Sequence, residues 1–255
     1  AETGDDTVHA AGNPPEPQAQ WRHMKVPSER MSERVQEFEA SASDPDEEKR
    51  GFLLVPEQKA MCKWFGAALD IAVDEEARPI PMTLRTQKAC LLIGGGGTGK
   101  TTIILKLLLD VFVEYFPPEN GEDRFVITTF SHAQGAAISD ENFKAQTAHT
   151  ATSYRVASLR NRDMSLKAKQ EEMERRWQPK ILLVEDEASL FPAMVQNMLL
   201  YRSMRGRQNF HDLKPEYYGD KEHLFGHMPI VIIAGDFLQM KPANDVSVEI
   251  GRAHV

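Results

Sequence analysis

Apolar residues along the chain form short runs that alternate with longer stretches of helical spacing. The runs expected to form buried strands are Ala89–Ile93, Phe125–Thr129, Ile181–Val184 and Pro229–Ala234. Helical spacing predicts helices at Pro56–Leu69 and Lys100–Phe116, and two prolines end the second helix. Strands that alternate with helices predict an α/β domain with a parallel sheet and helices on both of its faces.

The pattern is weaker outside these elements. Residues 1–50 are rich in Pro, Ser, Glu and Asp and hold few large apolar side chains, which predicts a disordered acidic segment. The spacing there allows one short helix, at Ser28–Glu39. The folded domain is expected to cover residues 51–249, with a charged, solvated insertion at about 155–180 and a polar, basic loop at about 201–228.

Composition narrows the class of protein. The chain has 255 residues, 41% of them hydrophobic, and a net charge of −8. No apolar run is long enough for a membrane span. The negative charge argues against general affinity for nucleic acid, although it allows a local basic groove. Cys62 and Cys90 fit no zinc spacing and are interpreted as reduced thiols of an intracellular protein.

The two ends of the chain are unusual. It begins with Ala1 rather than Met, so we expect the true N-terminus to lie upstream, and no targeting signal can be identified. The last six residues, Ile250–Val255, match the translation of a common sequencing adapter. Our hypothesis is that they are an artefact and that the native sequence of this chain stops near Glu249.

A phosphate-binding loop follows the first predicted strand. Gly94–Thr101 fits the pattern G-x-x-x-x-G-K-[ST], which binds ATP with Mg²⁺. Glycines let backbone amides turn toward the phosphates, and the following helix directs its positive N-terminal end at them. Lys100 is expected to reach the β- and γ-phosphates and Thr101 to bind Mg²⁺. The residues expected to hold the nucleotide are Gly94, Gly97, Thr98, Gly99, Lys100, Thr101 and Thr102.

Acidic residues end the strand at Ile181–Val184. Asp186 is expected to hold Mg²⁺, and Glu187 to act as the general base that polarises the attacking water. A catalytic glutamate at this place favours hydrolysis over transfer to a small acceptor. Glu185 is a third acid in the row, and it leaves the assignment open to a slip of one residue.

Several segments together resemble the Pif1/RecD-like superfamily 1B DNA helicases over about Leu54–Pro242. The matching segments are Leu54–Ala60 (Q motif), Phe125–Thr129 with Ser131–Ala137 (motif Ia), Thr147–Thr150, Asp186–Leu190 (motif II, D-E-x-S-M) and Gly235–Pro242 (motif III, G-D-x-x-Q-L-P-P). Motif III is the most specific of these. The resemblance implies a RecA-like P-loop domain, the first of the two motor domains of a helicase.

The resemblance also implies roles for individual residues. Gln58 would contact adenine, and Gln239 would sense the ATP state beside the γ-phosphate. Single-stranded DNA would be contacted by Thr129, His149 and Lys241. Lys241 stands where the family has a proline, and the loop after Thr129 lacks the usual T-G start, so this sequence departs from the family at its DNA contacts. An aromatic and basic cluster, comprising Tyr201, Arg202, Arg205, Arg207 and Phe210, could bind DNA, but a solvated insertion is favoured.

By resemblance, the protein is an ATP-dependent DNA helicase of 5′-to-3′ polarity. It would act on single-stranded DNA or junctions in repair, recombination or telomere maintenance, in the nucleus or mitochondrion. The arginine that completes the ATP site would come from a second RecA-like domain in the same protein, so these 255 residues are expected to bind ATP weakly and hydrolyse it slowly. Two alternatives stay open: a P-loop ATPase switch without unwinding, and a non-catalytic nucleotide-binding module from a decayed mobile-element helicase.

Overall fold

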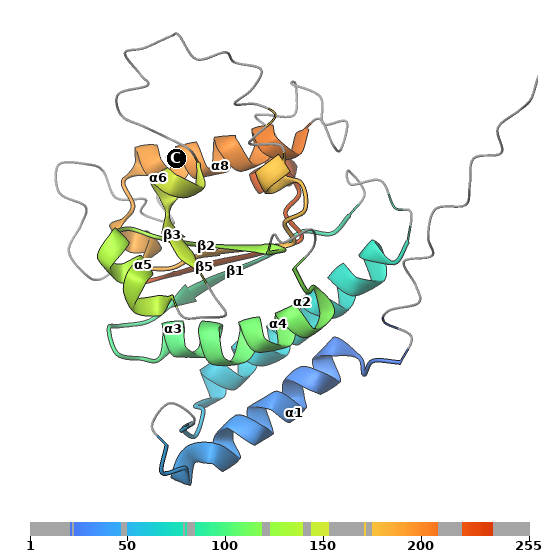
Figure 1. Ribbon diagram of the computed structural model, residues 1–255, viewed down its shortest axis with the longest axis vertical. Helices are drawn as coiled ribbons and strands as arrows, with labels where there is room; N and C mark the ends of the chain where they lie inside the picture. Colours follow the sequence, from blue (N-terminus) through green and yellow to red (C-terminus); the bar gives the residue numbers. More distant parts are fainter. Residues whose placement is uncertain are drawn as a thin grey trace, which may run out of the picture.

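The protein is shown in Figure 1 as a computed structural model. The structure describes residues 21, 23–46, 50–78, 80, 85–118, 123–139, 144–152, 171, 175–208 and 221–236. Gln239, Lys241, Phe210, most of the predicted insertion at 155–180 and the suspected adapter tail at 250–255 lie outside these residues. No helix in the described part is both long and apolar enough to cross a membrane.

Five parallel strands form one sheet in the order β1-β5-β4-β2-β3. The strands are β1 (Lys88–Ile93), β2 (Phe125–Thr129), β3 (Ala145–Thr147), β4 (Leu182–Glu185) and β5 (Ile230–Gly235). The α/β class and the four predicted strands are confirmed. β3 was not predicted, because it is short and two of its three residues are polar. With β5 inserted between β1 and β4, the strand order is that of the predicted RecA-like P-loop NTPase fold.

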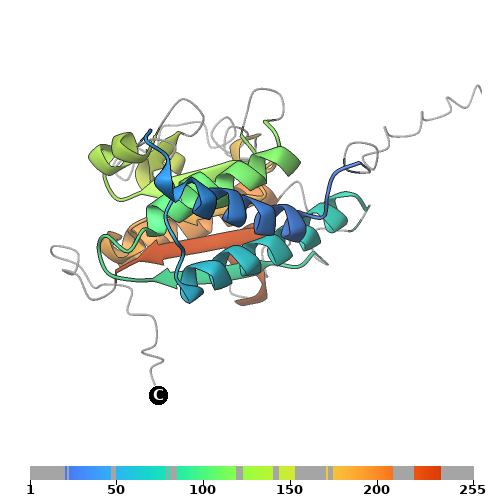
Figure 2. The ribbon, with the colours of Figure 1, turned by 90° about the horizontal axis from the view of Figure 1, so that it is seen from below.

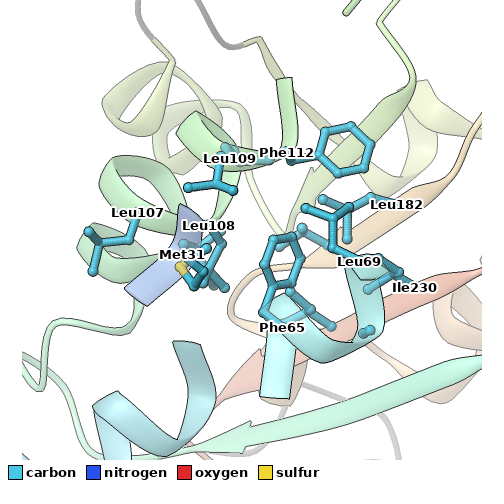
Figure 3. Close-up of a cluster of buried hydrophobic side chains, with 14 of the residues drawn as sticks. Met31, Phe65, Leu69, Leu107, Leu108, Leu109, Phe112, Leu182 and Ile230 are labelled. Carbon is cyan, nitrogen blue, oxygen red and sulfur yellow. The ribbon is translucent and has the colours of Figure 1, made fainter. Parts of the chain in front are cut away.

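One face of the sheet is covered by α2 (Pro56–Glu76) and by the helix that follows the phosphate loop. Figure 3 shows Phe65 and Leu69 of α2 and Phe112 of the second helix beside Leu182 and Ile230 of the central strands. α2 continues past its predicted end at Leu69, because Ala72 continues the apolar stripe. This layer forms the larger of the two cores around the sheet.

The helix after the phosphate loop is continuous but not uniform. It begins as α3 (Lys100–Ile103), widens into a π-helical segment (Ile104–Leu109) and ends as α4 (Asp110–Tyr115). The helix predicted at Lys100–Phe116 is therefore confirmed in extent. The π-helical segment within it was not predicted. Three consecutive leucines, Leu107–Leu109, are fully buried, since this helix is covered from both sides.

The outer cover is α1 (Pro27–Ala40), which lies across α2 and the helix after the phosphate loop (Figures 1 and 2). Met31, Val35 and Phe38 follow the i, i+4, i+7 spacing of one helical face, and Met31 and Phe38 are buried. The helix allowed at Ser28–Glu39 is confirmed. The prediction of disorder and of a domain start at residue 51 is wrong for the described residues from Trp21 onward. Their few apolar side chains lie on one face of α1, so they can be buried together against the core.

The opposite face of the sheet carries α6 (Ala148–Ala151) and α8 (Ala193–Gln208), which lie above the strands in Figure 1. A second core joins Leu199 of α8 to Leu183 and Trp177. Helices therefore cover both faces, as predicted. The solvated insertion predicted at 155–180 is wrong at its C-terminal end, because Trp177 is fully buried in this core.

The loop predicted at 201–228 is wrong at both ends. Residues up to Gln208 continue α8, and a short helix, η9 (Lys221–Gly226), precedes β5. Arg207 explains why, because its side chain is 0% exposed. Its guanidinium donates hydrogen bonds to carbonyls of both neighbouring segments, including Gly226 at 2.7 Å and Lys180 at 2.6 Å. A basic residue that sequence reasoning placed on the surface is thus an internal brace of the fold.

Candidate nucleotide site

The phosphate loop leaves β1 and enters α3 through two glycines in left-handed conformation. Gly97 has φ 74° and Gly99 has φ 78°. A Cβ atom built on Gly97 would meet nothing within 4 Å, so its backbone faces open space where phosphates can approach. A Cβ on Gly99 would lie 3.2 Å from the ring of Phe52. The sequence therefore needs glycine at these positions for conformation, and at Gly99 also for space.

Lys100 opens the helix after the loop and is almost completely buried. Its ammonium donates hydrogen bonds to the carbonyl of Gly95 at 2.9 Å and to that of Gly94. Thr98 also donates to the Gly95 carbonyl, at 2.9 Å, which closes the turn. The positive charge of Lys100 is therefore held within the loop, at the carbonyls of Gly94 and Gly95. Thr102 lies half-buried in the first turn of the helix.

The first contact between the loop and the acidic strand end joins Thr101 to Asp186. The Thr101 hydroxyl donates to the Asp186 carboxylate at 3.0 Å, and the second carboxylate oxygen, Oδ1, is buried with no hydrogen-bond partner among the described residues. Burial raises the pKa of Asp186, although the hydrogen bond from Thr101 opposes this shift. A hydroxyl and a carboxylate with a free oxygen fit Mg²⁺, which takes few protein ligands when phosphates complete its shell.

Glu187 follows in a left-handed conformation, with φ 54°, which is uncommon for a residue with a side chain. Its Oε2 is also buried without a hydrogen-bond partner among the described residues. Burial and then the charge of Asp186 raise the pKa of Glu187, while Lys100 lowers it. A carboxylate with a raised pKa is a better proton acceptor, which suits a general base.

Glu185 points to the other face of the sheet, because side chains alternate along a strand. The Gln196 side chain of α8 donates to its carboxylate at 2.7 Å. Full burial raises the pKa of Glu185 to about 7. The structure thus places Asp186, and not Glu185, beside Thr101, which favours the register chosen from the sequence.

Asp236 is a site residue that the sequence reasoning did not assign, although it lies within the quoted motif III. It follows β5, is largely buried, and contributes to raising the pKa of Glu187. The Asp236 amide donates to the Ser189 hydroxyl at 3.2 Å. A Cβ on the preceding Gly235 would lie 2.9 Å from the Ser189 amide, so only glycine allows motif III to pack this closely on motif II.

Gln58 lies in the first turn of α2 and contacts the phosphate loop. Its amide donates to the Thr98 carbonyl at 2.9 Å, and its carbonyl accepts from the Val55 amide at 2.9 Å. It therefore both caps α2 and fixes the loop. This position is next to the phosphate loop; the contact with adenine that the Q-motif resemblance implies stays a prediction.

Two of the residues expected to contact DNA, Thr129 and His149, differ in their exposure to solvent. Thr129 is only 1% exposed, and its hydroxyl donates to the Ser131 carbonyl at 3.0 Å, within the turn that starts α5 (His132–Ile138). Its side chain is not presented to a ligand. His149 lies on α6 and is partly exposed.

A family model described as "AAA domain" matches residues 78–242. A search of curated proteins found no match. Among solved structures, the chain is similar to the Pif1 helicase from Candida albicans, with 18% identity and a TM-score of 0.46, over 74% of this chain and 34% of that one. Unliganded Pif1 from Bacteroides sp matches with 15% identity and a TM-score of 0.41, over 76% of this chain and 34% of that one.

A third match is the Bacteroides Pif1 helicase in complex with ADP-AlF3 and ssDNA. Its identity is 14% and its TM-score 0.41, over 75% of this chain and 34% of that one. The chain therefore spans about a third of the length of the solved structures that it matches.

Proposed function

The chain belongs to the AAA domain family, and we propose that it is the ATP-binding first motor domain of a DNA helicase. The observation that carries the ATP-binding part of the proposal is the 3.0 Å contact between Thr101 and Asp186, with Glu187 adjoining. It brings the phosphate loop and the acidic strand end together at the carboxyl edge of one parallel sheet, where α/β proteins bind their ligands.

In the proposed mechanism the backbone amides of the loop and the Lys100 ammonium bind the phosphates. Thr101 and Asp186 would hold Mg²⁺, which neutralises charge on the β- and γ-phosphates. Glu187 accepts a proton from the attacking water, since its unpartnered oxygen and raised pKa suit that role. Asp236 adds negative charge beside Glu187. We propose Gln239, beyond the described residues, as the sensor of the γ-phosphate.

Helicase activity is proposed from the motif resemblance, and above all from Gly235–Pro242. We propose that His149 and Lys241 contact single-stranded DNA, that the polarity is 5′ to 3′, and that the protein serves repair, recombination or telomere maintenance. Thr129 is proposed to act indirectly, by holding the turn before α5. An arginine from a second RecA-like domain would supply about 10³–10⁵ in rate, so the chain alone is expected to hydrolyse ATP slowly.

The nucleotide site can be tested by titrating the 255-residue protein with a fluorescent ATP analogue, with and without Mg²⁺. Lys100→Ala removes a charge-assisted contact of about 1.5–3 kcal/mol, so affinity should fall roughly 10- to 100-fold. Asp186→Asn should remove most of the gain in affinity that Mg²⁺ provides. Lys63→Ala, a change of an exposed lysine on α2, is the matched control. Equal affinity of Lys100→Ala and Lys63→Ala would refute the proposed site.

DNA binding needs a separate assay on the longest natural form of the protein. Stacking of a base on a side chain contributes about 1–3 kcal/mol, so His149→Ala should weaken binding of a single-stranded oligonucleotide roughly tenfold in fluorescence anisotropy. His23→Ala, at an exposed position before α1, is the control. ATP binding without any DNA binding would favour the ATPase switch over the helicase.

A further inference from the structure

Glu185 is a buried acid in a place that suits an apolar residue. It is 0% exposed at the end of β4. It shares its face of the sheet with Leu183, which packs in the second core. Burial of a carboxyl group costs free energy unless hydrogen bonds compensate, and an aliphatic side chain would avoid that cost. A group kept at such a cost in a folded protein calls for an explanation.

One hydrogen bond compensates in part. The Gln196 side chain donates to Glu185 Oε2 at 2.7 Å, while Oε1 has no partner among the described residues. Gln196 lies near the start of α8. The backbone amide of Gln196 donates a hydrogen bond to the Pro192 carbonyl, which fixes the beginning of the helix. The side-chain contact therefore ties the end of β4 to the beginning of α8.

The tied end of β4 leads directly into the acids of the nucleotide site. Asp186 and Glu187 are the next two residues, and Glu187 is held at φ 54°. The Asp186 amide donates to the Thr128 carbonyl at 2.8 Å, which fixes the strand end toward β2. The Glu185–Gln196 contact fixes the same end toward α8. Together the two contacts set the direction in which the Asp186 and Glu187 side chains leave the sheet.

α8 also reaches the face that carries His149. A small cluster of Ala148, Phe191 and Val195 joins α6 to the start of α8, and the Phe191 ring lies 6.4 Å from that of Phe130. The Glu185–Gln196 contact thus connects the acids to α8, which packs against α6, the helix that carries His149.

We propose that Glu185 and Gln196 form a positioning pair, which holds the Asp186 and Glu187 carboxylates for Mg²⁺–nucleotide from the opposite face of the sheet. Neither residue touches the nucleotide. This inference rests on the proposed function, and it adds two residues from outside the nucleotide-binding motifs to the site.

The test measures how the affinity of a fluorescent ATP analogue depends on Mg²⁺ concentration, alongside thermal unfolding. Loss of a residue that orients a metal ligand typically weakens metal binding 10- to 100-fold, so Glu185→Leu should raise the Mg²⁺ requirement at least about tenfold. Its melting temperature should stay the same or rise, because a buried acid is removed. Gln196→Leu should raise the requirement equally, and the double variant should be no worse than either single one.

Two further variants separate positioning from general damage. Glu185→Gln keeps an acceptor for the Gln196 amide, and should stay within about twofold of the original protein. Glu76→Leu removes an acid paired with Arg85 and Arg124 at the opposite edge of the sheet. It should lower the melting temperature and leave the Mg²⁺ requirement unchanged.

Unchanged Mg²⁺ dependence in Glu185→Leu or Gln196→Leu overturns the positioning pair and leaves the proposed function standing. A Glu185→Gln variant as defective as Glu185→Leu also overturns it, because the hydrogen bond would then be irrelevant. If the unaltered protein binds no Mg²⁺–nucleotide, both proposals fail.

Discussion

Replacing Arg207 with methionine should destabilise the domain more than any change on its surface. The buried guanidinium donates to the carbonyls of five residues in two segments: Gly226 (2.7 Å), Trp177 (3.1 Å), Gln178 (3.2 Å), Lys180 (2.6 Å) and His227 (3.3 Å). Methionine fills similar space and donates no hydrogen bond.

The magnitude follows from the carbonyls left behind. A buried polar group without a partner costs about 1–3 kcal/mol, and relaxation and water will satisfy some of the five. Two unsatisfied carbonyls give a loss of roughly 2–6 kcal/mol. Removal of a buried charge offsets part of this, so we expect a net loss of about 2–4 kcal/mol. For a domain of this size each kcal/mol lowers the melting temperature by about 2–4 °C, so melting should fall by roughly 4–16 °C.

The assay is thermal and urea unfolding followed by circular dichroism. The control is Arg78→Met, two residues after the end of α2, whose exposed side chain forms an ion pair with Asp74 at 2.5 Å. Exposed pairs contribute about 0–1 kcal/mol, so this variant should be nearly neutral. Arg207→Lys should fall between the two, since an ammonium cannot reach both segments. If Arg207→Met has the same melting temperature and urea midpoint as the Arg78→Met control, the bracing role is refuted.

Three other predictions concern the loop, the first helix and pH. Gly97→Ala forces a side chain into a left-handed conformation at about 1–2 kcal/mol, so it should melt about 2–8 °C lower and bind nucleotide more weakly than Gly95→Ala, whose φ is not positive. Phe38→Ala should cost about 3–5 kcal/mol in urea unfolding; a neutral effect would show that α1 is not part of the domain. Burial raises the pKa of Glu185 in the folded state to about 7 from 4.5. Between these two values the folded state binds more protons at Glu185 than the unfolded chain does. The free energy of unfolding, relative to that of Glu185→Gln, should therefore fall as pH rises from about 4.5 to 7 and stay at a constant difference above 7. A difference in free energy of unfolding between the two proteins that is the same at every pH would contradict this.

Local sequence determined much of this protein. Apolar runs predict four strands and the helix after the phosphate loop. The glycines of the G-x-x-x-x-G-K-[ST] pattern predict the loop itself. These signals work because strand burial and loop geometry depend on residues close together in sequence. The same reasoning predicted roles for Asp186 and Glu187 from their place after a strand.

Tertiary structure decided the rest. Met31 and Phe38 are too few to predict a folded segment, and only the surfaces of α2 and the helix after the phosphate loop give them somewhere to be buried. The role of Arg207 depends on carbonyls up to 30 residues away. Glu185 and Asp186 are neighbours in sequence, yet one meets α8 and the other Thr101, because adjacent strand residues face opposite layers. Which polar groups wait in each layer is set by how the chain packs, and short-range patterns do not contain that information.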